Sequence, residues 1–148
     1  ANLYGGEAGV HFHPHPLDWL HVTSSFESVT GKKQNGDNLP LIPANKWNNA
    51  IKTTFKSTKD LKDSFAVLNL EYTLNQNNPS QFETSSNDYL LVNLGFGSRI
   101  TLGKKNIDIS LNATNLLNKN YTSHLSRLKT DRIPNMGRSI ILGMNFII

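Results

Sequence analysis

The chain has no cysteine, few charged side chains and no long apolar run. The absence of cysteine excludes a disulfide framework, a cysteine-based zinc site and thiol chemistry. No stretch of the 148 residues approaches the roughly 20 consecutive apolar residues of a membrane-spanning helix, which excludes an α-helical membrane protein. It does not exclude a membrane β-barrel, because the strands of such a barrel alternate apolar with polar residues.

Charge is scarce and also scattered. Charged residues make up 18% of the chain and hydrophobic residues 37%, and 19 asparagines fill part of the difference. The 15 lysines and arginines form no dense cluster, so we expect no nucleic-acid partner. The chain opens Ala1-Asn2-Leu3 with neither a methionine nor a signal peptide, and we therefore expect a processed chain or a piece of a longer protein.

Alternation of apolar and polar residues is the strongest pattern in the sequence. Between residues 107 and 114, Ile, Leu or Ala stands at every second position, with Asp, Ser, Asn or Thr between them. This period of two is typical of strands with one apolar and one polar face. The pattern predicts seven strands, over residues 4–13, 20–27, 47–56, 64–74, 89–100, 107–114 and 139–148. No helix of useful length is predicted.

Short and long connections alternate between these strands. The short ones are residues 14–17, 57–61 and 103–106, and the long polar ones are residues 31–46, 75–87 and 115–137. Transmembrane barrels have this layout, and a length near 10 residues suits a tilted strand that crosses a bilayer. A soluble sandwich, whose apolar face meets a second sheet, has no reason to sort its loops by length. We therefore predict a membrane barrel, with a soluble extracellular β-sandwich that binds carbohydrate or protein as the alternative.

The carboxyl end carries a more specific pattern. Gly143, Phe146 and Ile148 stand at spacings of three and two. This is similar to the terminal signal of bacterial outer-membrane proteins, in which a glycine precedes two outward-facing aromatic or apolar residues. The similarity implies that these three residues form an outer-membrane insertion signal. Two departures are Ile148, where an aromatic residue is usual, and Ile141, where a polar residue is usual.

Other segments resemble TonB-dependent outer-membrane receptors, in the order in which that family has them. They are the Gly5-Gly6-Glu7 opening with the strand near Trp19, the Leu39–Pro43 loop, residues 83–94, the run 111–121 (LNATNLLNKNY) and the Gly137-Arg138 pair. The stretch from His124 to Lys129 (HLSRLK) is closest to Bacteroidetes-type receptors that import siderophores, haem or metals. Residues 1–148 thus resemble the carboxyl-terminal barrel part of such a receptor.

The resemblance implies an all-β fold, an antiparallel transmembrane β-barrel of about 22 strands of which this chain supplies the last seven. The plug domain and the earlier strands would precede Ala1, and the carboxyl terminus would face the periplasm. The implied location is the bacterial outer membrane. The implied partners are the protein's own plug, the TonB complex (through the missing amino-terminal region), the barrel-insertion machinery and the lipid bilayer. The implied function is capture of a ferric siderophore, haem or a metal, followed by TonB-coupled import, with no cofactor.

The longest predicted loop holds the candidate ligand-binding residues His124, Arg127, Lys129 and Arg132. Outer loops of such receptors contact the ligand, and cationic side chains suit an anionic siderophore or a carboxylate. The alternative is a solvated, packed loop without a binding role. No hydrolase, metalloprotease, phosphate-loop or dinucleotide-binding motif is present, so we expect no enzymatic activity.

His11, His13 and His15 form a His-x-His-x-His pattern near the first predicted turn. Alternate residues of a strand share a face, so these imidazoles are the candidates for a metal site. Two prolines interrupt the strand here, and we interpret the three histidines as a polar rim or turn and predict no metal site. His21, on the polar face of the next strand, is expected to form hydrogen bonds in the lumen.

Overall fold

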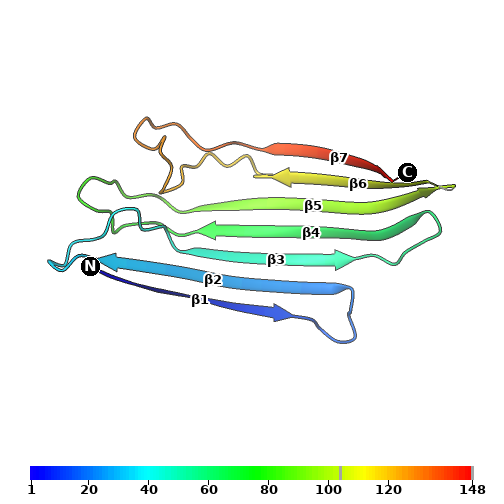
Figure 1. Cartoon of the computed structure of the whole chain (residues 1–148), viewed down its shortest axis with the longest axis horizontal. Helices are drawn as coiled ribbons and strands as arrows, with labels where there is room; N and C mark the ends of the chain where they lie inside the picture. Colours follow the sequence, from blue (N-terminus) through cyan, green and yellow to red (C-terminus); the bar gives the residue numbers. More distant parts are fainter. Residues whose placement is uncertain (104, 148) are drawn as a thin grey trace.

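The computed structural model describes residues 1–103 and 105–147, which form seven strands joined into one antiparallel sheet (Figure 1). The strands are β1 (Asn2–Phe12), β2 (Leu20–Lys32), β3 (Lys46–Thr54), β4 (Leu61–Thr73), β5 (Tyr89–Leu102), β6 (Lys105–Thr114) and β7 (Ser139–Ile147). Each strand pairs with the next in the chain, so the order in the sheet is the order in the sequence. The all-β prediction and the seven predicted strands are confirmed. None of the described residues belongs to a helix long and apolar enough to cross a membrane.

The connections are sorted by length at the two ends of the sheet. The long ones, residues 33–45, 74–88 and 115–138, lie together at the left end in Figure 1. The short turns that join β1 to β2, β3 to β4 and β5 to β6 lie at the opposite end. This arrangement follows from the antiparallel order, because successive strands reverse direction. We call the two ends the long-loop end and the short-turn end.

The strand register places the apolar positions of all seven strands on one face. One row across the sheet, in hydrogen-bonding order, consists of Phe12, Val22, Ile51, Leu68, Leu94, Ala113 and Ile140. Directly paired residues of an antiparallel sheet point to the same side, so this row is continuous from edge to edge. A row on the other face carries polar residues such as Glu7, Glu27 and Lys46.

The apolar face has no second layer over it in the described part of the chain. Leu94, in the middle of the sheet, is 42% exposed, and Leu142, on β7, is 65% exposed. None of the large side chains among the described residues is fully buried. A sandwich core therefore does not form within these residues. The sheet is open, with β1 and β7 at its edges.

Close packing occurs on the polar face, where Phe65 of β4 lies over Gly97 of β5. The two residues are direct partners, next to an irregularity in the register between Lys62 and Phe65. A Cβ atom at Gly97 would lie 2.5 Å from the Phe65 ring. Lys52 of β3 places its ammonium group 5.3 Å from the centre of the same ring. Because glycine has no side chain, position 97 leaves room for the Phe65 ring on the polar face of the sheet.

Candidate ligand pocket at the long-loop end

The three long loops are joined to one another by hydrogen bonds. Asn38, in the first loop, donates its amide to the Pro79 carbonyl oxygen of the second at 3.1 Å. Gln76 donates from Nε2 to the carbonyl oxygens of Ile42 and Pro43 at 3.2 and 3.1 Å. Gln76 also exchanges two backbone hydrogen bonds with Ser86, which closes the second loop on itself. The loops therefore form one connected layer above the strand ends.

Glu83 is a second junction between these loops. Its carboxylate accepts a hydrogen bond from the Leu41 backbone N–H at 2.8 Å and another from the Ser80 N–H at 3.0 Å. The Leu41 N–H is the main reason that the pKa of Glu83 lies below its usual value, since these bonds favour the charged form. Glu83 therefore carries its negative charge at neutral pH and contacts both the first and the second loop.

His124 and Lys129 join the third loop to the second. The Lys129 ammonium group donates to the Thr84 carbonyl oxygen at 2.5 Å and to the Ser86 hydroxyl at 2.7 Å. The Ser86 Oγ lies 2.8 Å from His124 Nδ1, and Lys129 Nζ lies 3.3 Å from the same ring nitrogen. The Lys129 ammonium group can only donate, so its contact with Nδ1 requires an unprotonated Nδ1, which also accepts from the Ser86 hydroxyl. The imidazole is then neutral, with Nδ1 as an acceptor.

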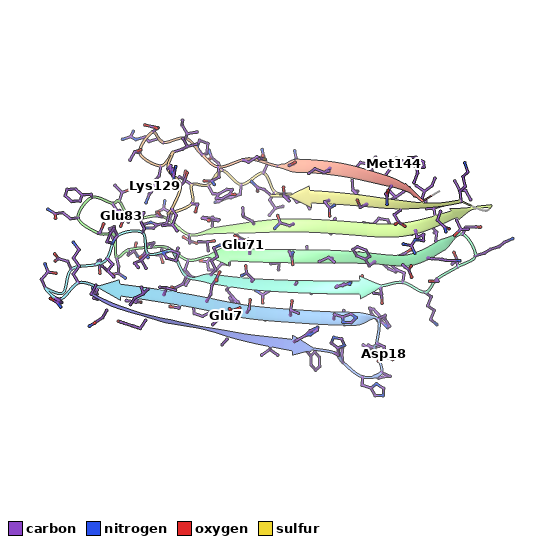
Figure 2. All side chains as sticks on the ribbon, in the orientation of Figure 1. Glu7, Asp18, Glu71, Glu83, Lys129 and Met144 are labelled. Atoms are coloured by element: carbon purple, nitrogen blue, oxygen red, sulfur yellow. The ribbon has the colours of Figure 1, made fainter. Side chains whose placement is uncertain are left out.

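The local environment favours this neutral form of His124. Its side chain is buried, and burial lowers the pKa of the imidazole, with the nearby Lys129 charge as a second cause. Glu83 acts in the opposite direction and raises the His124 pKa. Burial also lowers the pKa of Lys129. Figure 2 shows Glu83 and Lys129 close to each other at the long-loop end.

A pocket of about 600 Å³ opens beside this junction, and all four candidate residues from the sequence line it. His124, Arg127, Lys129 and Arg132 lie on its wall together with Glu83. The apolar lining comes from Leu41, Phe82 and Leu125 of three different loops. Phe82 is 92% exposed, whereas phenylalanine side chains are usually buried.

The four basic candidates have two different environments. His124 and Lys129 are committed to hydrogen bonds that hold the second and third loops together. Arg127 and Arg132 are exposed and face the same pocket, so their guanidinium groups are available to a ligand. Guanidinium groups bind carboxylate and phosphate oxygens in a bidentate manner. The pocket can accommodate a ligand with an apolar body and anionic substituents.

The base of the third loop is fixed by Asn115, which is buried and has a positive φ of 48°. Its backbone N–H donates to the Asn93 side chain at 2.9 Å. Its own side chain accepts from the Lys119 N–H at 2.7 Å and donates to the Lys119 carbonyl oxygen at 2.9 Å. Asparagine tolerates this left-handed conformation and can mimic a backbone turn with its side chain. This local turn explains the Asn-Leu-Leu-Asn run in structural terms.

The pocket contains residues that the sequence did not indicate. Leu41, Phe82 and Glu83 come from loops that carry no signal for contact with the third loop, although two of these segments contribute to the family resemblance. Ser86 was also missed, because a serine in a polar loop is unremarkable. Contacts between loops that are separated by whole strands leave no periodic pattern in the sequence, so they could not be predicted from it.

The terminal pattern and the histidines lie elsewhere. Gly143 pairs with Ser110, and Phe146 is 63% exposed on the apolar face. Ile148 lies outside the described residues. His11, His13 and His15 are at the short-turn end, where His15 approaches Asp18 and is not part of the cluster that contains His11 and His13. No protein-family model matches this chain.

Proposed function

We propose that the chain is the carboxyl-terminal barrel segment of an outer-membrane receptor that captures a ferric siderophore, haem or a metal and imports it with TonB coupling. The observation that carries the proposal is the apolar face, which is continuous over seven strands and has no protein layer upon it among the described residues. In this proposal the face contacts the hydrocarbon of the bilayer.

The size of this face favours lipid over water. Seven strands at about 4.8 Å spacing span about 29 Å, and nine residues at about 3.3 Å each span about 30 Å. The resulting area of roughly 900 Å² exceeds the about 300–600 Å² of the largest apolar patch on a typical soluble monomer. With the tilt of about 35–45° of such barrels, a length of about 30 Å covers about 21–25 Å along the membrane normal, close to the apolar band of about 25 Å of outer-membrane barrels.

The connectivity supports a barrel as the whole to which the sheet belongs. Strands that follow one another in strict sequence, with short turns at one end and long loops at the other, are typical of outer-membrane barrels. The edges β1 and β7 carry backbone groups that need partners. In the proposed receptor these partners are the strands that precede β1.

The long-loop end is the proposed site of ligand capture. The pocket beside Arg127 and Arg132 offers two guanidinium groups and the apolar side chains of Leu41 and Phe82. Haem and aromatic siderophores combine an apolar body with anionic oxygens, so both fit this chemistry. His124 and Lys129 contribute by holding the loops in place.

Spin labelling of single cysteines tests the membrane part of the proposal. The chain has no cysteine, so once any cysteine elsewhere in the full-length protein is replaced by serine, each introduced one is unique. In the full-length protein in its native membrane, a label at Ile51→Cys on the apolar face should be accessible to oxygen and inaccessible to a water-soluble nickel chelate. A label at the adjacent Ala50→Cys, on the polar face, is the matched control and should not show this combination. A label at position 51 that neither reagent reaches would indicate a second protein sheet, as in a soluble sandwich, and would contradict the proposal.

A further inference from the structure

Three histidines converge at the short-turn end of the sheet. His11 lies in β1, His13 directly follows β1, and His21 lies in β2. One ring nitrogen from each histidine lies within 4.8 Å of the other two. The cluster, which we call the histidine triad, differs from the His-x-His-x-His pattern of the sequence, because His21 takes the place of His15.

The backbone explains this selection. His11 and His13 are two residues apart on an extended chain, so their side chains point to the same face. Pro14 restricts His13 to an extended conformation and so continues the alternation past the end of β1. The pairing of His11 with Thr23 and of Phe12 with Val22, continued by one residue, sets His13 opposite His21. His15 lies beyond this register and approaches Asp18 at 3.7 Å.

The ring nitrogens are closer than a hydrogen-bonding scheme among neutral imidazoles can satisfy. His13 Nε2 lies 2.9 Å from His11 Nε2 and 2.8 Å from His21 Nδ1. A ring nitrogen has one in-plane position, which holds either a proton or a lone pair. His13 Nε2 can therefore form one of these two hydrogen bonds at a time. A cation that accepts three lone pairs satisfies all of the nitrogens together.

We propose that the histidine triad is a binding site for a divalent transition-metal ion of the class of zinc, copper or nickel. Imidazole nitrogen is a preferred ligand of these ions, and metal–nitrogen distances are about 2.0–2.1 Å. At such distances two nitrogens are about 2.9 Å apart when they subtend a right angle at the metal, and about 3.3 Å apart in a tetrahedron. The separations of 2.9 and 2.8 Å match the right-angled case, and the third pair of nitrogens lies within 4.8 Å.

The surroundings determine which ions fit. The cluster consists of three neutral nitrogen ligands without a carboxylate, so it suits neither calcium nor magnesium, which require oxygen ligands. Lys52, the strand partner of His21, is the neighbouring cation, and its ammonium group is placed over the Phe65 ring. His11 and His13 are exposed and His21 is half-buried, so an ion can reach the site from solvent and keep water as its remaining ligand.

The histidine triad lies at the other end of the strands from the ligand pocket. Asp18, in the β1–β2 turn, and Glu83, beside the pocket, mark these two ends in Figure 2. Metal binding at the triad is therefore independent of whether the long loops capture a nutrient. A failure of either proposal leaves the other unaffected.

Zinc affinity measured by competition with a chromophoric chelator tests the site. The full chain should bind one equivalent of Zn²⁺ in this region. His11→Ala, His13→Ala and His21→Ala should each weaken binding by more than the about 10–100-fold that loss of a residue supporting a metal ligand typically costs. His15→Ala, a histidine in the same segment but outside the triad, is the matched control and should bind Zn²⁺ as the parent chain does.

The position of His21 separates a folded site from a flexible histidine-rich segment. Binding that depends on His11, His13 and His15 but is unchanged in His21→Ala would overturn the proposal, and so would the absence of Zn²⁺ binding by the parent chain. Copper(II) loaded into the parent chain provides an independent readout. Its electron paramagnetic resonance spectrum should show coupling to three nitrogens, reduced to two in His21→Ala, and an unchanged spectrum in that variant would also contradict the site.

Discussion

Ser86 Oγ and His124 Nδ1 lie 2.8 Å apart, although 38 positions separate the two residues in the chain. The contact joins the loop between β4 and β5 to the loop between β6 and β7. Lys129 completes the junction, because its ammonium group reaches both residues. The geometry of the pocket thus depends on a hydrogen-bond network that holds one imidazole neutral next to a positive charge.

Acidification should loosen this junction. The folded-state pKa of His124 is lowered, so the unfolded chain takes up a proton more readily than the folded chain. The stability that His124 contributes is therefore fully present above its ordinary pKa of about 6.5 and is lost as pH falls below it. Amide hydrogen exchange in residues 115–138 should become faster between pH 7 and pH 5.5, relative to the intrinsic rate at each pH.

The groups around His124 define the control for this pH effect. Lys129 lowers its pKa, Glu83 raises it, and Arg127 and Arg132 line the same pocket. His124→Gln keeps a side chain of similar polarity that does not titrate, so the extra exchange at low pH should disappear. His15→Gln, at the other end of the sheet, should retain it. An equal pH dependence in parent chain and His124→Gln would contradict the role of His124.

Substitution of Lys129 should lower the stability of the fold, whereas substitution of Arg127 should not. Lys129→Met removes the ammonium group that donates to Thr84 and Ser86, and we expect it to lower the free energy of unfolding by about 1.5–3 kcal/mol. Arg127→Gln, at an exposed position, should change it by less than about 0.5 kcal/mol. Denaturant unfolding of the folded protein measures both. Equal losses in the two variants would show that Lys129 does not hold the loops together.

Binding of an anionic ligand should depend on the two exposed arginines of the pocket. In the full-length protein, Arg127→Gln and Arg132→Gln should each weaken haem or ferric siderophore binding by about 10–100-fold, since a hydrogen bond to a charged group contributes about 1.5–3 kcal/mol. Lys119→Gln changes an exposed lysine of the same loop that does not line the pocket, and it should bind as the parent does. A loss of the same size in Lys119→Gln would indicate a general effect of charge.

A methyl group at Gly97 should destabilise the sheet. Its Cβ atom would lie 2.5 Å from the Phe65 ring, so Gly97→Ala forces the ring or the strands apart. We expect a loss of about 1–3 kcal/mol, the usual cost of overpacking, and partial recovery when Phe65→Leu is added. Gly6→Ala, in β1, is the matched control because no atom lies within 4 Å of its added Cβ. Unfolding free energies of the four proteins test the contact.

Asn115→Ala should disorder the base of the third loop. The substitution removes the hydrogen bonds to Lys119 and places alanine at a φ of 48°, for a combined cost of about 2–4 kcal/mol. Asn120→Ala, an exposed asparagine of the same loop, should cost less than about 0.5 kcal/mol. Thermal unfolding checks both values, and a neutral Asn115→Ala would contradict the role given to this turn.

The strands were predictable because an apolar face imposes a period of two, and this period occurs within each strand on its own. Residues 107–114 were predicted as a strand, and β6 spans Lys105–Thr114. The distribution of long and short connections was readable for the same reason. The strand boundaries at the long loops were harder to predict, since polar residues such as Lys32 continue a strand without any change of pattern.

The sites depend on which strands and loops meet, and the sequence contains no periodic signal for that. Arg127 and Arg132 were predicted to bind ligand, but the link from Lys129 to Ser86 required the loops in three dimensions. The histidine triad illustrates the limit more directly. His11 and His13 share a face by alternation, whereas His21 joins them through the register of a neighbouring strand. His15 was grouped with them by its spacing alone.

The strict neighbour-by-neighbour order of the strands has a consequence for how the sheet assembles. Each strand pairs with the strand next to it in the chain, so every pairing step closes one loop, the largest being residues 115–138. The entropic cost of loop closure rises only slowly with loop length, and the sheet can therefore grow one hairpin at a time. Insertions in the long loops should leave this order of assembly unchanged. The long-loop end is thus free to diversify during evolution while the folding route of the strands is preserved.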